Sequence, residues 1–356
     1  MKNHEEGKSR LFVVFAACLS AAVCLTGCAS LRGKGDADLS LWRNGAPAKA
    51  ALLEYVRAVT EKDSPDYIPQ PERIAVFDFD GTLFCETDPT YFDWVLFERR
   101  VLDDPSYRPT PEQLAAAKAS RSRTAIPGLT HDRERLMLEV YEGMTLEAFE
   151  SFVRGFMREP HTGFTGLKRG EAYYLPMLEV VHLLLANEFS VYVCSGTDRL
   201  VLRPVVRSKL PLPPQWIIGS DSTLLARAQG TDDGLAFTYR TTDELVLGGK
   251  SIVKNLQMNK VTVLVREIGI QPVLAFGNSS SDISMLNYTL QKNPHKAMGF
   301  MVLCDDLERE YGDAKKAEAM RSACKKNGWV PISMRDDWKT IYGDGVERTR
   351  AGGARR

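Results

Sequence analysis

Several short apolar runs set the strongest constraint on how this chain folds. Each run is too short for a helix and contains no charged residue; the runs are Ile74–Phe77, Val191–Val193, Trp216–Ile218, Val273–Phe276 and Phe300–Leu303. A short apolar run that lacks the alternation of a half-exposed strand is typical of a strand buried on both faces. Such strands need helices on both sides of their sheet.

Helical segments alternate with these runs. Apolar residues recur at helical spacing over residues 47–59, 175–187 and 261–268. The alternation of strand and helix predicts an α/β fold with a doubly wound (Rossmann-like), mostly parallel sheet. Ligands of such sheets bind at the carboxyl ends of the strands, so the residues that follow each run are the candidates for a functional site.

A long helical insertion follows the first run. Beyond Leu83 the apolar spacing predicts helices and no strand for about a hundred residues; the helices are Phe92–Leu102, Glu112–Ala119, Arg133–Glu142 and Leu146–Met157. We therefore expect a helical cap inserted after the first core strand, at residues 85–185. Residues 46–84 and 186–345 would form the α/β core, and residues 346–356 a flexible basic tail.

The first residues have the pattern of an export signal. Basic residues precede an apolar run at Leu11–Val23, which is short for a membrane-spanning helix. The run leads to Leu25-Thr26-Gly27-Cys28, which resembles the bacterial lipoprotein processing box. That resemblance implies a signal peptide at residues 1–27, lipidation of Cys28 and a tether at residues 28–45. The protein would then be anchored to a membrane of the bacterial cell envelope and would face outside the cytoplasm.

Composition narrows the range of partners. Lys plus Arg and Asp plus Glu both total 46, so no overall positive charge attracts nucleic acid. We expect no nucleic acid partner, and nothing in the sequence implies a protein partner. Beyond the leader the cysteines are Cys85, Cys194, Cys304 and Cys324, an even number that permits disulfides outside the cytoplasm. Cys194 and Cys304 end apolar runs, which favours buried thiols.

Two carboxylates directly follow the first run. Asp78 and Asp80 are separated by one residue and precede Gly81 and Thr82, so a turn there would present both at the end of the strand. Two close, buried carboxylates repel each other unless a cation compensates them, and Mg²⁺ prefers oxygen ligands. One carboxylate is suited to attack phosphorus and the other to protonate the departing alkoxide.

Three further motifs extend this pattern into a family resemblance. The segment Asp78-Phe79-Asp80-Gly81-Thr82 resembles motif I of the haloacid dehalogenase-like hydrolases, which implies Asp78 as nucleophile, Asp80 as general acid/base and Thr82 beside the phosphate. The strand that ends in Cys194-Ser195-Gly196 resembles motif II, in which Ser195 and Gly196 would bind the phosphate at a helix N-terminus. The segment Gly277–Asp282 resembles motif IV, which supplies Mg²⁺ ligands.

The remaining site residues follow from the same resemblance. Asp78, the main-chain carbonyl of Asp80, Asn278 and Asp282 would bind Mg²⁺; the family commonly has an acid where this chain has Asn278, which predicts weaker metal affinity. Motif III is a lysine that pairs with the nucleophile. Lys250, Lys254 and Lys260 are candidates, and the position of Lys260 at the start of a helix is most similar to the phosphoserine-phosphatase-like branch.

The resemblance implies a function for the whole chain. In relatives a Glu shortly after motif I binds a substrate amine, and Glu86 lies close to that position. We expect a Mg²⁺-dependent phosphomonoester hydrolase that forms an aspartyl-phosphate from a small phosphorylated metabolite, phosphoserine-like or phosphocholine-like. The alternative is a weakly catalytic or non-catalytic surface lipoprotein that uses the same fold as a binding module.

Overall fold

The computed structural model describes residues 39–86, 91–123 and 129–349. The predicted signal peptide, Cys28, most of the tether and most of the basic tail lie outside the described residues. By their contacts the described residues belong to one compact unit. None of the helices in this part of the chain combines the length and the apolar character needed to cross a bilayer.

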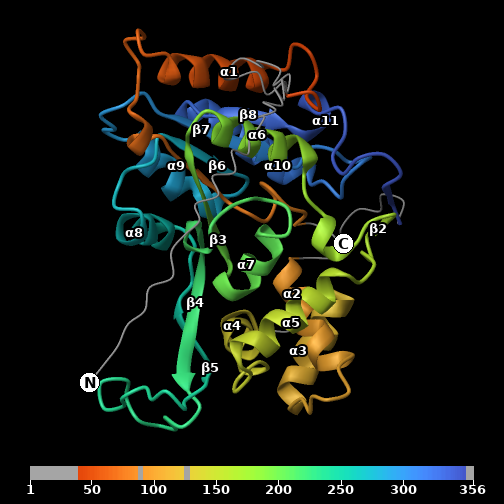
Figure 1. Ribbon diagram of the computed structural model, residues 1–356. Helices are drawn as coiled ribbons and strands as arrows, with labels where there is room; N and C mark the ends of the chain where they lie inside the picture. Colours follow the sequence, from red (N-terminus) through yellow and green to blue (C-terminus); the bar gives the residue numbers. More distant parts are fainter. Residues whose placement is uncertain (1–38, 87–90, 124–128, 350–356) are drawn as a thin grey trace, which may run out of the picture. The chain divides into compact units, whose positions relative to one another are not determined.

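A seven-stranded sheet forms the core, in the order β5-β4-β3-β1-β6-β7-β8 (Figure 1). Its strands are β1 (Ile74–Phe77), β3 (Ser190–Asp198), β4 (Ile217–Ala226), β5 (Leu245–Val253), β6 (Leu274–Gly277), β7 (Met298–Leu303) and β8 (Val330–Ser333). Every neighbouring pair is parallel except β4 and β5. The predicted fold class is confirmed, and β1 lies at the centre, where the order of the strands reverses.

The ends of β1 and β6 are held in register by aromatic packing. Phe77 stacks on Phe276 with ring centroids 4.2 Å apart, and Phe276 stacks on Phe300 at 4.9 Å. These three residues are directly paired across neighbouring strands. Because the carboxyl ends of the two central strands coincide, the residues that follow them emerge side by side.

Two strands of the sheet do not follow from the apolar runs. β8 contains Pro331, which removes a hydrogen-bond donor and is tolerated there because β8 is an edge strand. β5 ends in exposed residues, including Lys250, and pairs antiparallel with the distal part of β4. β4 therefore extends well beyond the predicted run, and its hairpin with β5 reaches the helical insertion. A small second sheet pairs β2 (Phe164–Thr165) with β9 (Glu347–Arg348).

The insertion consists of helices, as expected. Their bounds are α2 (Phe92–Leu102), α3 (Pro111–Ser122), α4 (Leu129–Glu139) and α5 (Leu146–Met157). The start of α3 is fixed by a capping box in which Thr110 and Gln113 bond each other's main chain, and Thr145 caps α5. Helix α4 contacts β5 and helix α5 contacts α7 (Arg199–Val206), so the insertion packs against the β4–β5 side of the core.

The remaining helices surround the sheet. They are α1 (Pro47–Thr60), α6 (Leu175–Ala186), α8 (Met258–Glu267), α9 (Ile283–Leu290), α10 (Ala314–Asn327) and the short α11 (Met334–Asp337). Helix α6 contacts β3, so it packs on the sheet. The division into core and cap stays a prediction. The described cysteines, Cys85, Cys194, Cys304 and Cys324, are all buried, and none of them forms a disulfide within the described ranges.

Candidate active site

The candidate site lies where β1, β3 and β6 end. Asp78 follows β1, and its main-chain N–H donates to the carbonyl of Phe276 on β6 at 2.9 Å. Asn278 follows β6, and Ser195 lies within β3. The topology therefore brings together residues that are far apart in the sequence, as expected for the carboxyl edge of a parallel sheet.

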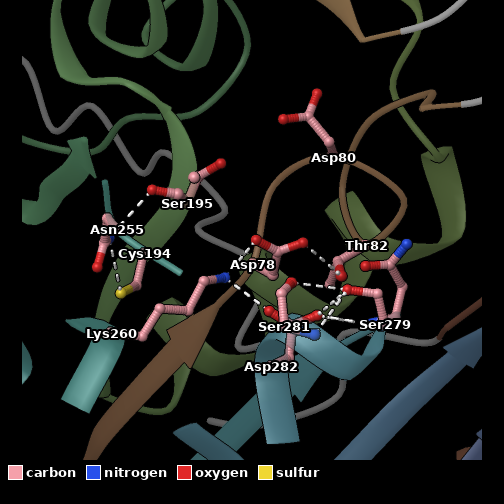
Figure 2. A network of polar contacts seen from close by, with 12 residues as sticks. Asp78, Asp80, Thr82, Cys194, Ser195, Asn255, Lys260, Ser279, Ser281 and Asp282 are labelled. Carbon is pink, nitrogen blue, oxygen red and sulfur yellow. Dashed lines mark hydrogen bonds and ion pairs between the residues drawn. The ribbon is translucent and has the colours of Figure 1, made fainter. Parts of the chain in front are cut away.

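Lys260 joins two of the acidic residues. Its ammonium lies 2.6 Å from Oδ1 of Asp78 and 2.6 Å from Oδ1 of Asp282, and its side chain is fully buried (Figure 2). Lys260 occupies the first turn of α8, which directs it toward the end of β1. Of the three candidate lysines, Lys260 is the one in contact with Asp78, whereas Lys250 is exposed and Lys254 lines a neighbouring cavity.

Asp282 also fixes the loop after β6. Its Oδ2 accepts hydrogen bonds from the main-chain N–H groups of Asn278 and Ser279, both at 3.1 Å, and from the Ser279 hydroxyl at 3.2 Å. Since Oδ1 contacts Lys260, both oxygens of this carboxylate have partners. Asp282 therefore links Lys260 to the motif IV loop, and the single buried ammonium holds Asp78 and Asp282 together.

The loop after β1 turns sharply at Gly81. This residue has a φ of 82°, and a Cβ built on it would lie 1.8 Å from Nδ2 of Asn278 and 1.9 Å from Oε2 of Glu86. Only glycine fits both the backbone conformation and the close approach of these side chains. The turn separates the two carboxylates, because the Asp80 side chain points away from Asp78 (Figure 2).

Asp80 is held from the motif II strand. Its Oδ2 accepts a hydrogen bond from the Thr197 hydroxyl at 2.7 Å, whereas its Oδ1 is buried and has no partner among the described residues. Sequence reasoning did not identify Thr197. The sequence could have indicated Thr197, because it is a hydroxyl residue two positions after Ser195. Residues two positions apart lie on the same side of an extended strand.

Ser195 and Gly196 form the wall of the site on β3. The Ser195 side chain is buried, and its hydroxyl accepts from the main-chain N–H of Thr197 at 3.2 Å. The amide of Asn255 donates to the Ser195 carbonyl at 3.0 Å, so Asn255 positions this segment, although no motif pointed to it. Helix α7 starts only after Asp198, which accepts from the N–H of Leu200 at 2.8 Å. A carboxylate therefore caps the helix N-terminus that sequence analysis assigned to the phosphate.

Glu86 and Thr82 occupy different surroundings. The Glu86 carboxylate contacts the Lys316 ammonium through Oε1 and the Asn278 amide nitrogen through Oε2, so the protein itself engages both oxygens. The Thr82 hydroxyl is buried and lies 3.5 Å from Oδ2 of Asp78. Thr82 is therefore placed beside the nucleophile, while Glu86 links the first loop to α10.

Burial sets the proton affinities of the site. Burial, together with the neighbouring Asp282 charge, raises the pKa of Asp78 to about 7, against the opposing effect of Lys260. Burial raises the pKa of Asp80 well above its usual value, and the Asp93 carboxylate adds to the effect. Burial disfavours the charge of Lys260, but Asp282 and Asp78 raise its pKa overall. The acidic groups of the site thus outnumber its one lysine, and burial disfavours the charged forms of Asp78 and Asp80.

This donor set fits a divalent cation. Asp78, Asp80 and Asp282 are buried with one buried lysine among them, an imbalance that a hard cation would relieve. In the described ranges no three His, Cys, Asp or Glu side chains converge as a self-sufficient metal site. Mg²⁺ does not need such a cage, because it is usually held by one or two carboxylates, waters and substrate phosphate. Asn278 contacts Glu86 through its amide nitrogen, so its amide oxygen remains available as a donor.

Comparison with known proteins identifies the family. The model of the haloacid dehalogenase-like hydrolases matches residues 75–287, from β1 to α9. The chain belongs to this family. The match includes Asp78, Asp80, Ser195, Lys260 and Asp282, so the residues that meet at the carboxyl edge of the sheet lie within the haloacid dehalogenase-like part of the chain. No curated protein matches the chain in sequence.

Solved structures resemble the chain at low sequence identity. A conserved functionally unknown protein from Anaerococcus prevotii DSM 20548 has a TM-score of 0.50 and 12% identity over 80% of this chain and 91% of that one. Cytosolic 5'-nucleotidase IIIB bound to cytidine has a TM-score of 0.45 and 13% identity over 82% and 87%. A phosphoserine phosphohydrolase-like protein from Francisella tularensis has a TM-score of 0.36 and 14% identity over 65% and 87%.

The contact between Asn278 and Glu86 predicts the effect of restoring an acid in motif IV. In Asn278→Asp two carboxylates would meet above Gly81, so we expect a loss of about 1–3 kcal/mol in the free energy of unfolding. Adding Glu86→Gln should recover most of this loss. Urea unfolding of the single and double variants measures it, with the exposed Asn44→Asp as the matched control. If Asn278→Asp is as stable as the wild type, the contact has no energetic role.

Proposed function

We propose that this chain is a Mg²⁺-dependent phosphomonoesterase that works through an aspartyl-phosphate on Asp78. The observation that supports it most strongly is the buried Lys260 bridging Asp78 and Asp282 at the end of the central strand. Such a bridge orients one carboxylate and leaves its second oxygen for chemistry. Membership of a hydrolase family and a separately held second carboxyl group at Asp80 agree with this function.

Asp78 and Asp80 have different roles in the proposed reaction. Oδ1 of Asp78 is held by Lys260, so Oδ2 attacks phosphorus while the bond from phosphorus to the ester oxygen breaks. Asp80 gives its proton to the departing alkoxide and then accepts a proton from the water that hydrolyses the aspartyl-phosphate. Ser195 and Thr82 lie where they would hold phosphoryl oxygens. Bound Mg²⁺ would supply charge compensation for those oxygens.

Hydrolysis of p-nitrophenyl phosphate by the full-length protein tests this function. We expect turnover with Mg²⁺ and its loss after chelation by EDTA, with recovery when Mg²⁺ is returned. If a folded protein, verified by a cooperative thermal transition, hydrolyses neither this ester nor small phosphorylated metabolites at any Mg²⁺ concentration, the phosphatase function is wrong. The alternative, a binding module on the same fold, would then be the better description.

We further propose that the protein is anchored at the cell envelope by a lipid on Cys28. The basic start, the apolar run Leu11–Val23 and the box that ends in Cys28 support this location. In cells supplied with a labelled fatty acid, we expect label in the wild-type protein and in Cys24→Ser, and none in Cys28→Ser. Cys24 is the matched control, because it lies four positions earlier in the same leader. Labelled Cys28→Ser would place the attachment elsewhere.

A further inference from the structure

A cavity lies beside the site, between the helical insertion and the core. Its empty space is about 560 Å³, which includes open solvent at its mouth. Helices α2 and α4 line it on one side, and α7, β4 and β5 line it on the other. Most of the lining side chains are leucine, methionine, valine and aromatic residues, so an apolar body of a few carbon atoms would fit there.

The cavity adjoins the residues that act on the substrate. Ser220, which lines it, donates from its hydroxyl to the carbonyl of Gly196 at 2.7 Å. Asp198, another lining residue, directly follows Thr197, whose hydroxyl binds Asp80. Asp80 protonates the leaving oxygen in the proposed reaction. The part of the substrate beyond that oxygen therefore lies on the side of Asp80, toward this cavity.

Acidic side chains dominate the polar part of the cavity. Asp93, Glu134, Asp198 and Asp221 line it, and Lys254 is the basic residue among the described lining residues. Asp221 is neutralised by Arg199 at 2.8 Å, and Glu134 accepts a hydrogen bond from the Ser251 hydroxyl at 2.5 Å. The other three acids, Asp93, Glu134 and Asp198, outnumber the single lysine, so the cavity is better suited to a cationic than to an anionic ligand.

Two residues that line the cavity each have one buried polar atom without a hydrogen-bond partner among the described residues. Asp93 is 8% exposed and Tyr141 is 5% exposed. Within the described part of the chain, neither Oδ1 of Asp93 nor the Tyr141 hydroxyl has a hydrogen-bond partner. Burial raises the pKa of Asp93, against the opposing effects of Lys254, the main-chain N–H groups of Trp94 and Asp93, and Arg133. A buried carboxylate oxygen without a partner is costly, and a cationic ligand beside Oδ1 of Asp93 would remove that cost.

We propose that this cavity binds the leaving group of the phosphomonoester, and that this group is a small alcohol with a positively charged amino or quaternary ammonium group facing Asp93. The proposal rests on the phosphatase function. The Tyr141 ring offers a second favourable contact for a cation. Glu86 does not serve this purpose, because Lys316 and Asn278 engage its two oxygens.

Matched pairs of substrates test the proposal. Phosphocholine is compared with its neutral isostere 3,3-dimethylbutyl phosphate, and phosphoethanolamine with propyl phosphate, using the full-length protein and Mg²⁺. We expect kcat/KM to favour the charged member of at least one pair by at least about tenfold, the value of one charge-assisted contact. In Asp93→Asn that ratio should fall close to one. The exposed Glu147→Gln, which removes one charge from the same helical insertion, should keep the wild-type ratio.

A binding measurement separates this proposal from the phosphatase function. Ligand-observed NMR compares choline and ethanolamine with 3,3-dimethylbutan-1-ol and propan-1-ol. Binding of an amine that is lost in Asp93→Asn would support the cavity even if the protein hydrolysed nothing. Turnover of p-nitrophenyl phosphate with equal kcat/KM for both members of each pair would overturn the cavity proposal and leave the phosphatase function intact.

A second variant tests the proposal in case Asp93→Asn does not fold. Glu134→Gln changes a lining residue that is partly exposed, and it should lower the preference for the charged ester in the same direction by a smaller factor. A preference for anionic leaving groups, reduced by Lys254→Met, would assign the cavity to the opposite charge and overturn the proposal.

Discussion

Asp78→Asn is expected to reduce phosphatase turnover by at least about 10⁴-fold, because it removes the nucleophile of a covalent reaction. An amide does not attack phosphorus, and no other carboxylate among the described residues lies between Lys260 and Thr82. The substitution should leave the fold intact. Burial already disfavours the charge of Asp78, and Lys260 keeps Asp282 as its partner.

The measurement should separate chemistry from folding. Initial rates with p-nitrophenyl phosphate are compared at saturating Mg²⁺ for the wild type, Asp78→Asn and the exposed control Asp63→Asn. Beryllium fluoride, which mimics a phosphoryl group on an aspartate, should raise the melting temperature of the wild type and of Asp63→Asn alone. Activity of Asp78→Asn within tenfold of the wild type would remove Asp78 from the reaction.

The sequence predicted the parts of the site that depend on local pattern. Asp78 follows the central strand and Asn278 follows its neighbour, so topology alone places them together. Lys260 needed a finer argument, because three lysines precede the strand that leads to motif IV. Its position in the first turn of α8 determines that its side chain, and not that of Lys250, reaches Asp78.

Other parts of the site depend on tertiary contacts that no local pattern encodes. Lys316 reaches Glu86 from a helix that lies 230 positions further along the chain. Asn255 holds the Ser195 segment from a loop without a recognisable motif. The cavity at Asp93 lies where the insertion packs against the β4–β5 hairpin. The sequence did not predict β5, because two glycines and the exposed Lys250 and Ser251 interrupt its apolar residues. These contacts could be identified only from the structure.

Asp80 is arranged as a proton donor. Burial, with the neighbouring Asp93 charge, raises its pKa well above the usual value, which favours the protonated form of the carboxyl group. The Thr197 hydroxyl binds Oδ2 and leaves Oδ1, which has no partner among the described residues, to hold and release the proton. The contribution of such a general acid to the reaction rate is largest for leaving groups that depart slowly without a proton.

Asp80→Asn should therefore slow hydrolysis of an alkyl phosphate by about 10²–10⁴-fold, and the first step with p-nitrophenyl phosphate much less. Nitrophenolate departs without a proton, but hydrolysis of the aspartyl-phosphate still needs a base. We expect rapid-mixing measurements to show a burst of about one nitrophenolate per active site, followed by slow turnover. Thr197→Val keeps the Asp80 carboxyl group but removes the hydrogen bond that Thr197 donates to it. This variant should lose less activity with the alkyl ester than Asp80→Asn, and it should show no burst. Equal losses for the two esters in Asp80→Asn, without a burst, would show that Asp80 positions the loop and transfers no proton.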